Sequence, residues 1–270
     1  MKQDSKKIAM LTAYDYTSAK ILDETGIPVI LVGDSVGQWL LGYETTIPVT
    51  MDDMVHHTKA VTRGAQTAHI VADMPFMSYQ ADSVDALRNA GRLIKEGGAQ
   101  SVKLEGGITI AETVRGIVAA GVPVMGHIGF TPQSVNQLGG NIVQGKFPNA
   151  AASLIEDALA LQSAGAYSIV LEMVPAELAA VVTKRLSVPT IGIAAGVHCD
   201  GQVQVFHDLL GLIEDFSPKH ARPYAQLAAT IKKAVSEYVS DVESQKFPSD
   251  TESHHIKPAL IEQITTGLSA

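Results

Sequence analysis

Several residue types that would indicate a secreted or nucleic-acid-binding protein are scarce in this sequence. Cys199 is the only cysteine among 270 residues, which excludes an internal disulfide framework and fits a reducing compartment. The 20 Lys and Arg residues are outnumbered by 28 Asp and Glu, and the formal net charge of -8 argues against a nucleic-acid partner and, without a basic cluster, against an anionic membrane. No secretory segment or long apolar span is present. We therefore expect a cytoplasmic protein with no membrane partner.

The residues that are abundant indicate a compact α/β protein. Hydrophobic residues make up 46% of the chain, and 23 glycines and 12 prolines suit an architecture with many tight turns. Apolar runs and helical stretches alternate along the chain without a linker, which favours one large domain. We predict a single domain over residues 1–250 and a C-terminal extension over residues 251–270.

A short apolar run that is followed by an acid recurs four times. The runs and their acids are residues 29–32 with Asp34, 68–71 with Asp73, 101–104 with Glu105, and 168–171 with Glu172. Each run is typical of a buried strand. A glycine precedes each run, and we expect it to end the preceding helix: Gly26, Gly64, Gly98 and Gly165.

Four further apolar runs bring the predicted strands to about eight. They are residues 8–12, 122–126, 189–193 and 202–206, and the run at 122–126 ends at His127. Predicted helices separate the strands, at 17–25, 50–63, 83–95, 149–164 and 176–186, with further helices at 223–243 and 256–268. This pattern favours a (β/α)8 barrel, with an open doubly wound sheet as the alternative.

The position of the acids predicts a metal site. Ligands of parallel α/β proteins bind outside the carboxyl ends of the strands, so acids at these ends converge on one pocket. Convergent carboxylates repel one another unless a cation lies between them. A single acid after a strand is more often a helix cap than a ligand, but four in the same position are harder to explain in that way. We therefore expect a divalent metal.

Two other residues are candidates for the same pocket. Side chains alternate along a strand, so Lys103 points the same way as Glu105, and a buried ammonium is costly unless it is paired. His127 follows a strand, where a structural role and a catalytic role are about equally expected. The polar, glycine-rich segment 131–148 is long enough to be a lid or a binding loop.

Seven motifs resemble those of the ketopantoate hydroxymethyltransferase family, over residues 8–248. They are residues 10–15, 31–35, 72–76, 102–107, 126–129, 131–135 and 199–202. The resemblance implies a (β/α)8 barrel of the phosphoenolpyruvate/pyruvate type and a homo-oligomer, often a decamer. It also implies hydroxymethyl transfer from 5,10-methylenetetrahydrofolate to α-ketoisovalerate (3-methyl-2-oxobutanoate), a step of pantothenate biosynthesis. The family usually has glycine at the position of Ala194.

The resemblance also implies roles for individual residues. Asp34, Asp73 and Glu105 would serve a magnesium site. Ser35 and Lys103, together with Asp34 and Asp73, would hold the keto acid. Glu172 would be the base, and His127 is the next candidate.

Together these residues would form an enolate that is stabilised by the metal and attacks the one-carbon unit of the folate. One alternative is a magnesium-dependent lyase or mutase that acts on a 2-oxo acid. Such lyases commonly use a reactive loop cysteine, and Cys199 is the only cysteine here. A non-catalytic barrel that binds a ligand is the second alternative.

Overall fold

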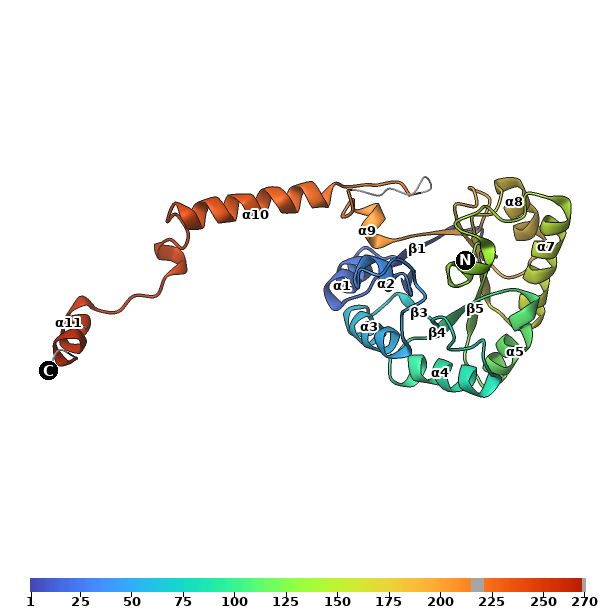
Figure 1. The fold of residues 1–270 in the computed structure, drawn as a ribbon, viewed down its shortest axis with the longest axis horizontal. Coiled ribbons are helices and arrows are strands. Elements are labelled where there is room, and N and C mark those ends of the chain that lie inside the picture. The colour runs from blue at the N-terminus through green and yellow to red at the C-terminus, as the bar shows by residue number, and fades with distance from the viewer. Residues whose placement is uncertain (215–220, 269–270) are drawn as a thin grey trace. The chain divides into compact units, whose positions relative to one another are not determined.

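Eight parallel strands close into a barrel in the computed structural model, which describes residues 1–214 and 221–268 (Figure 1). The strands are β1 Ile8–Thr12, β2 Val29–Val32, β3 His69–Asp73, β4 Ser101–Glu105, β5 Val124–Gly129, β6 Ser168–Glu172, β7 Thr190–Ile193 and β8 Gly201–Gln204. Each strand pairs with the next in sequence, and β8 pairs with β1. The predicted (β/α)8 barrel is confirmed.

Helices surround the barrel on its outer side (Figure 1). The longer ones are α1 Tyr16–Glu24, α3 Met51–Gly64, α4 Ser83–Lys95, α5 Ala111–Ala119, α7 Pro148–Ser163 and α8 Ala176–Arg185. Short helical segments lie in the loops: α2 Val36–Trp39, η1 Ile108–Ile110, η2 Pro132–Ser134, α6 Val135–Leu138 and α9 Phe206–Leu209. All of the long helices except α5 are among those predicted.

Local capping explains where several helices begin. Asp15 and Asp82 accept backbone hydrogen bonds at the starts of α1 and α4. Thr50 and Asp53 form a reciprocal capping box at the start of α3. Such caps satisfy N–H groups that have no partner within the helix, and each contributes about 1 kcal/mol.

Alternation along the strands creates two apolar layers. The interior of the barrel is filled by Met10, Leu31, Val71, Met125, Val170 and Ile191. Alternate strand residues, such as Ile30 and Leu171, pack with the helices instead. Lys103 lies in register with Met125 on β5, and Glu105 with His127. The same alternation therefore places charged side chains above the apolar interior.

Three predicted details differ in the structure. Strand β5 continues to Gly129, so His127 lies inside the strand. Gly64 is the last helical residue of α3, and Ala65 is the C-cap in its place; Gly64 instead permits close packing, since an added Cβ would lie 2.4 Å from the Tyr16 carbonyl oxygen. Strand β8 ends at Gln204, and Phe206 begins α9.

Ala194, where the family usually has glycine, has a φ of 54°, in the left-handed region that glycine adopts most easily.

The described residues form two compact units, 1–209 with 221–222, and 210–214 with 223–268. The second unit contains α10 Leu227–Glu243, η3 Asp250–Glu252 and α11 Pro258–Gly267. Helix α10 begins four residues later than predicted, because the N–H groups of Leu227 and Ala228 bond to carbonyl groups of residues 210 and 211. The predicted division at residue 250 stays a prediction, and residues 269–270 of the extension lie outside the described residues. No helix in the described ranges is long and apolar enough to cross a membrane.

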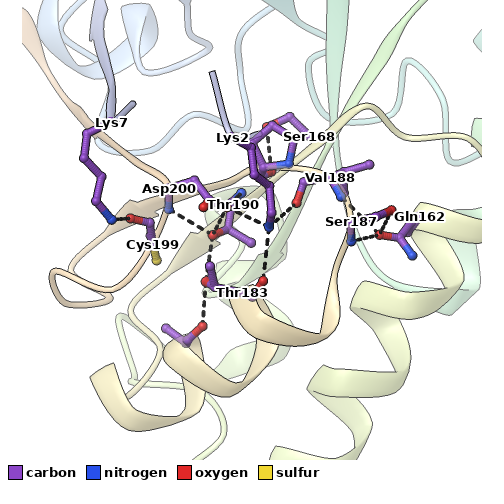
Figure 2. Close-up of polar contacts among 12 residues, drawn as sticks. Lys2, Lys7, Gln162, Ser168, Thr183, Ser187, Val188, Thr190, Cys199 and Asp200 are labelled. Carbon is purple, nitrogen blue, oxygen red and sulfur yellow. Dashed lines mark hydrogen bonds and ion pairs between the residues drawn. The ribbon is translucent and has the colours of Figure 1, made fainter. Parts of the chain in front are cut away.

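Polar contacts tie the segment before β1 to the amino-terminal end of the barrel (Figure 2). The Lys2 ammonium lies 2.9 Å from Oδ2 of Asp200 and donates to the carbonyl oxygens of Thr183 and Val188, at 3.1 and 2.9 Å. The same Asp200 oxygen accepts from the backbone N–H of Thr190, the first residue of β7, at 2.9 Å. One carboxylate thus joins this segment to β7 and β8.

Replacing Lys2 should destabilise the barrel. In Lys2→Met the partly buried Asp200 carboxylate loses its cation, which we expect to cost about 1–3 kcal/mol of the free energy of unfolding. Urea denaturation measures this loss. Lys6→Met, an exposed residue of the same segment, is the matched control. An equal effect of the two substitutions would show that the Lys2 contacts do not stabilise the fold.

Candidate active site

Six ionisable side chains meet near the carboxyl ends of strands β2 to β6. They are Asp34, Asp73, Lys103, Glu105, His127 and Glu172. All are buried except Glu172, which is partly open to solvent. Neighbouring strands of a parallel barrel end at the same rim, so residues that are distant in sequence become neighbours. The structure brings together all the acids that were expected to converge, with the lysine and the histidine.

Lys103 lies between two of the carboxylates. Its Nζ atom is 3.2 Å from Oδ1 of Asp73 and 3.9 Å from Oε1 of Glu105. Burial lowers the pKa of Lys103, but the charges of Asp73 and Glu105 outweigh burial and hold this pKa above its ordinary value. Lys103 therefore carries a fixed positive charge into the barrel at neutral pH.

His127 connects Glu105 with Glu172. Its Nδ1 atom lies 3.4 Å from Oε1 of Glu105 and 3.1 Å from Nζ of Lys103. Its Nε2 atom is 3.2 Å from Oε2 of Glu172, within ion-pair distance but not aligned for a hydrogen bond. Burial and the charge of Lys103 lower the pKa of His127, and the two carboxylates raise it more, to about 9. We therefore assign a protonated imidazole, whose Nδ1 donates toward Glu105 and does not accept from Lys103.

The three buried acids differ in how well their charges are compensated. Burial raises the pKa of Asp34, and the charges of Asp73 and Glu105 raise it further. Burial also raises the pKa of Asp73, against the charge of Lys103. For Glu105, burial is outweighed by the hydrogen bond with His127 and by the charges of His127 and Lys103, so its pKa is lowered. The carboxylate of Glu105 is thus favoured in its charged form, whereas burial outweighs the charge of Lys103 for Asp34 and Asp73.

Asp34 and Asp73 fit a divalent cation. The Oδ1 atom of Asp73 is buried and receives no hydrogen bond from the described residues. Within the same ranges, no three acid, histidine or cysteine side chains are arranged to hold a metal ion by themselves. Magnesium, however, is usually held by one or two carboxylates and keeps several waters. We therefore favour Asp34 and Asp73 as direct ligands, and a role for Glu105 in this site stays a prediction.

Gln133 holds the acid cluster in place, although it is not among the predicted site residues. Its side-chain Nε2 donates to Oδ2 of Asp34 at 2.8 Å and to the carbonyl of Met74 at 2.9 Å. Its backbone N–H donates to Oε2 of Glu105 at 3.0 Å, and its Oε1 accepts from the Tyr79 hydroxyl at 2.7 Å. The sequence signals for this residue were its place in the long segment 131–148 and in the motif at residues 131–135.

Ser35 borders the acid cluster at the start of α2. Its Oγ atom lies 2.8 Å from the hydroxyl of Tyr14, and either group can be the donor. Tyr14 is fully buried, so its hydroxyl stays in place beside Ser35. The Ser35 hydroxyl is therefore held next to Asp34, at the edge of the charged cluster.

Comparison with known proteins identifies close relatives. The sequence model of the ketopantoate hydroxymethyltransferase family matches residues 1–250. A 3-methyl-2-oxobutanoate hydroxymethyltransferase of Dehalococcoides mccartyi (strain CBDB1) is 60% identical over 98% of this chain and 95% of its own length. The protein of the same name from Carboxydothermus hydrogenoformans is 57% identical over 98% of this chain and 96% of its own length.

Solved structures share the barrel fold. The structure of 2,3-dimethylmalate lyase, a member of the PEP mutase/isocitrate lyase superfamily, aligns with a TM-score of 0.59 at 15% identity. The alignment covers 99% of this chain and 92% of the lyase. At this identity the likeness concerns the fold alone, and it agrees with the closed eight-stranded barrel.

Replacement of Gln133 should loosen the acid cluster. Gln133→Leu removes the side-chain donor to the Asp34 carboxylate and the Met74 carbonyl, which we expect to cost about 1–3 kcal/mol of the free energy of unfolding. Urea denaturation measures this cost. Gln137→Leu changes an exposed glutamine of α6 and is the matched control. Equal stability of Gln133→Leu and the parent protein would contradict the role of Gln133.

Proposed function

Because the chain belongs to the ketopantoate hydroxymethyltransferase family, and is therefore a transferase, we propose that it transfers a hydroxymethyl group to 3-methyl-2-oxobutanoate. The donor would be 5,10-methylenetetrahydrofolate, and the reaction would belong to pantothenate biosynthesis. One water is consumed, so that the products are ketopantoate and tetrahydrofolate. The observation that carries the proposal is the buried cluster in which Lys103 and His127 are arranged among the four acids.

The keto acid would bind between Ser35 and Lys103. Its carboxylate needs positive charge and a hydrogen-bond donor, which the Lys103 ammonium and the Ser35 hydroxyl can provide. Two buried cations among four carboxylates leave an excess of negative charge, which would repel an anionic substrate. A bound cation would reverse this repulsion.

Asp34 and Asp73 would hold a divalent cation, with Glu105 as a further predicted contributor. When bound, such an ion would neutralise charge that develops on the keto oxygen as the neighbouring carbon loses its proton. Gln133 donates to Oδ2 of Asp34, and this contact fixes the direction in which the other carboxylate oxygen points. The chain's own residues would thus orient the acids before the substrate arrives.

Glu172 would accept the proton from the third carbon of the keto acid. It is the most exposed of the four acids in the cluster, so it remains reachable by a substrate. The protonated His127 has no free lone pair with which to accept a proton, and its Nε2 orients the Glu172 carboxylate instead. The electron pair of the broken C–H bond would then form the new C–C bond to the one-carbon unit.

The two alternative functions receive less support. Cys199 is buried and directly precedes β8, so it lies at the amino-terminal end of the barrel, away from the acid cluster. A lyase that depends on a reactive loop cysteine therefore lacks this group at the site. A non-catalytic barrel would need no costly burial of Lys103 and His127 among acids. A homo-oligomer, with the decamer as the form often found in the family, and a cytoplasmic location stay predictions; sedimentation velocity tests the former.

Removal of divalent cations should abolish the transferase activity, and magnesium should restore it. Asp34→Asn and Asp73→Asn should also weaken magnesium binding by about tenfold or more, because each removes a negative ligand. Isothermal titration calorimetry measures this binding independently of turnover. Asp85→Asn, on the exposed face of α4, is the control. Full activity after exhaustive chelation would refute the cation requirement.

Replacement of Glu172 should block proton removal. Wild-type protein with magnesium should exchange the carbon-bound proton of 3-methyl-2-oxobutanoate with deuterated water even without folate. Glu172→Gln keeps the shape of the side chain but has no carboxylate to accept the proton, so exchange should fall by roughly 100- to 10,000-fold. Proton NMR follows the exchange, and Glu177→Gln, an exposed acid of α8, is the control. Wild-type exchange in Glu172→Gln would assign the base elsewhere.

A further inference from the structure

An aromatic cluster lies beyond the end of β8. The ring of His207, in α9, lies 5.7 Å from the rings of Tyr14 and Phe206, centre to centre. The ring of Trp39, in α2, is 6.4 Å away and nearly parallel to it, with an interplanar angle of 10°. Aromatic rings at these separations attract one another and form flat apolar faces. None of these rings takes part in the acid cluster described above.

Polar atoms next to these rings have no partners. Oε1 of Gln204, Nδ1 of His207 and Oδ1 of Asp208 are all buried, and none has a hydrogen-bond partner within the described ranges. An unsatisfied buried polar atom costs about 1–3 kcal/mol, so three of them within five residues call for a function. Burial raises the pKa of Asp208 to about 6, as expected for a carboxyl group that no donor contacts.

The cluster adjoins the keto-acid site. The backbone N–H of Phe206 donates to Oγ1 of Thr12, at the end of β1, at 2.9 Å. The Tyr14 ring contacts His207, and its hydroxyl lies 2.8 Å from Oγ of Ser35. One side chain thus connects the cluster to a residue that would bind the keto acid. In the closed strand order, β8, β1 and β2 form the wall opposite to β5 and β6, which carry His127 and Glu172.

We propose that Gln204, His207 and Asp208, together with the rings of Tyr14 and Trp39, bind the flat heteroaromatic ring of the one-carbon donor. This inference rests on the proposed function. A pterin ring carries an amino group and a ring N–H that donate hydrogen bonds, and the two unpartnered oxygens of Gln204 and Asp208 are acceptors. Its flat faces would stack on the aromatic side chains.

Binding at this cluster requires a local rearrangement. The three polar atoms are shielded from water, so a ligand reaches them only after a covering side chain turns aside. Trp39 is partly buried and lies on His207, and its rotation would exchange one aromatic contact for another. The cost of opening would then be offset by hydrogen bonds to atoms that have none in the closed form.

Tryptophan fluorescence offers a direct test, because Trp39 is the only tryptophan of the chain. Tetrahydrofolate should change the Trp39 emission of the wild-type protein, and calorimetry should give the affinity. Gln204→Leu and Asp208→Leu should each weaken the affinity about tenfold or more, as expected when the acceptor of one buried hydrogen bond is removed. Two variants are used, and thermal melting verifies that each one is folded.

A variant of the proposed metal site serves as the matched control. Asp73→Asn should weaken magnesium binding but keep its affinity for tetrahydrofolate, whereas Asp208→Leu should show the reverse. If wild-type protein transfers the hydroxymethyl group while both cluster variants bind tetrahydrofolate normally, the inferred site is wrong and the proposed function stands. If tetrahydrofolate binds at Trp39 and no transfer occurs, the proposed function fails and the site stands. If tetrahydrofolate leaves Trp39 and the calorimetric signal unchanged, the site is overturned.

Discussion

The excess of negative charge buried at the carboxyl ends of the strands is the constraint on which the rest of the site depends. Lys103 lies between Asp73 and Glu105, and His127 lies between Glu105 and Glu172. Burying these charges would be prohibitive without the pairing that Lys103 and His127 provide. The pairing is uneven, since Glu105 contacts both cations and Asp73 contacts Lys103, and the pKa is lowered for Glu105 but raised for Asp34 and Asp73. This unevenness marks the two acids as the place where a further cation would stabilise the protein.

The barrel converts a repeated local pattern into this arrangement. Charged side chains lie at or just after the carboxyl ends of β2 to β6, two of them on β4, and the register fixes which residues become neighbours, as when Asp73 aligns with Lys103 and Glu105 with His127. Apolar side chains fill the interior below, so the charged layer has no room to relax downward. The loop residue Gln133 closes the layer from the other side, through hydrogen bonds to Asp34 and Glu105. The positions of the charged side chains are therefore fixed by the strand register, by the apolar interior below them and by Gln133 above them.

The difference between strand residues and loop residues explains what could be predicted from the sequence. The ends of the strands are visible in the sequence as apolar runs followed by an acid. The convergence of Asp34, Asp73, Glu105 and Glu172 could therefore be predicted from these runs and from the topology of a parallel barrel. Gln133 could not be found in that way, because its contacts depend on the path of a loop rather than on a repeating pattern. His127 was expected to follow a strand at residues 122–126 but lies inside β5, because Ile128 and Gly129 continue the strand beyond it.

The two ends of the barrel differ in how completely their polar groups are satisfied. At the amino-terminal end one oxygen of Asp200 is contacted by Lys2 and Thr190, and these contacts hold the fold together. At the carboxyl end the side-chain acceptors of Gln204 and Asp208 receive no hydrogen bond from the described residues. Unsatisfied buried groups lower stability, and a fold retains them at low cost only where a ligand satisfies them. Polar groups at the amino-terminal end of the barrel thus stabilise the fold, whereas some at the carboxyl end remain available to bind a ligand.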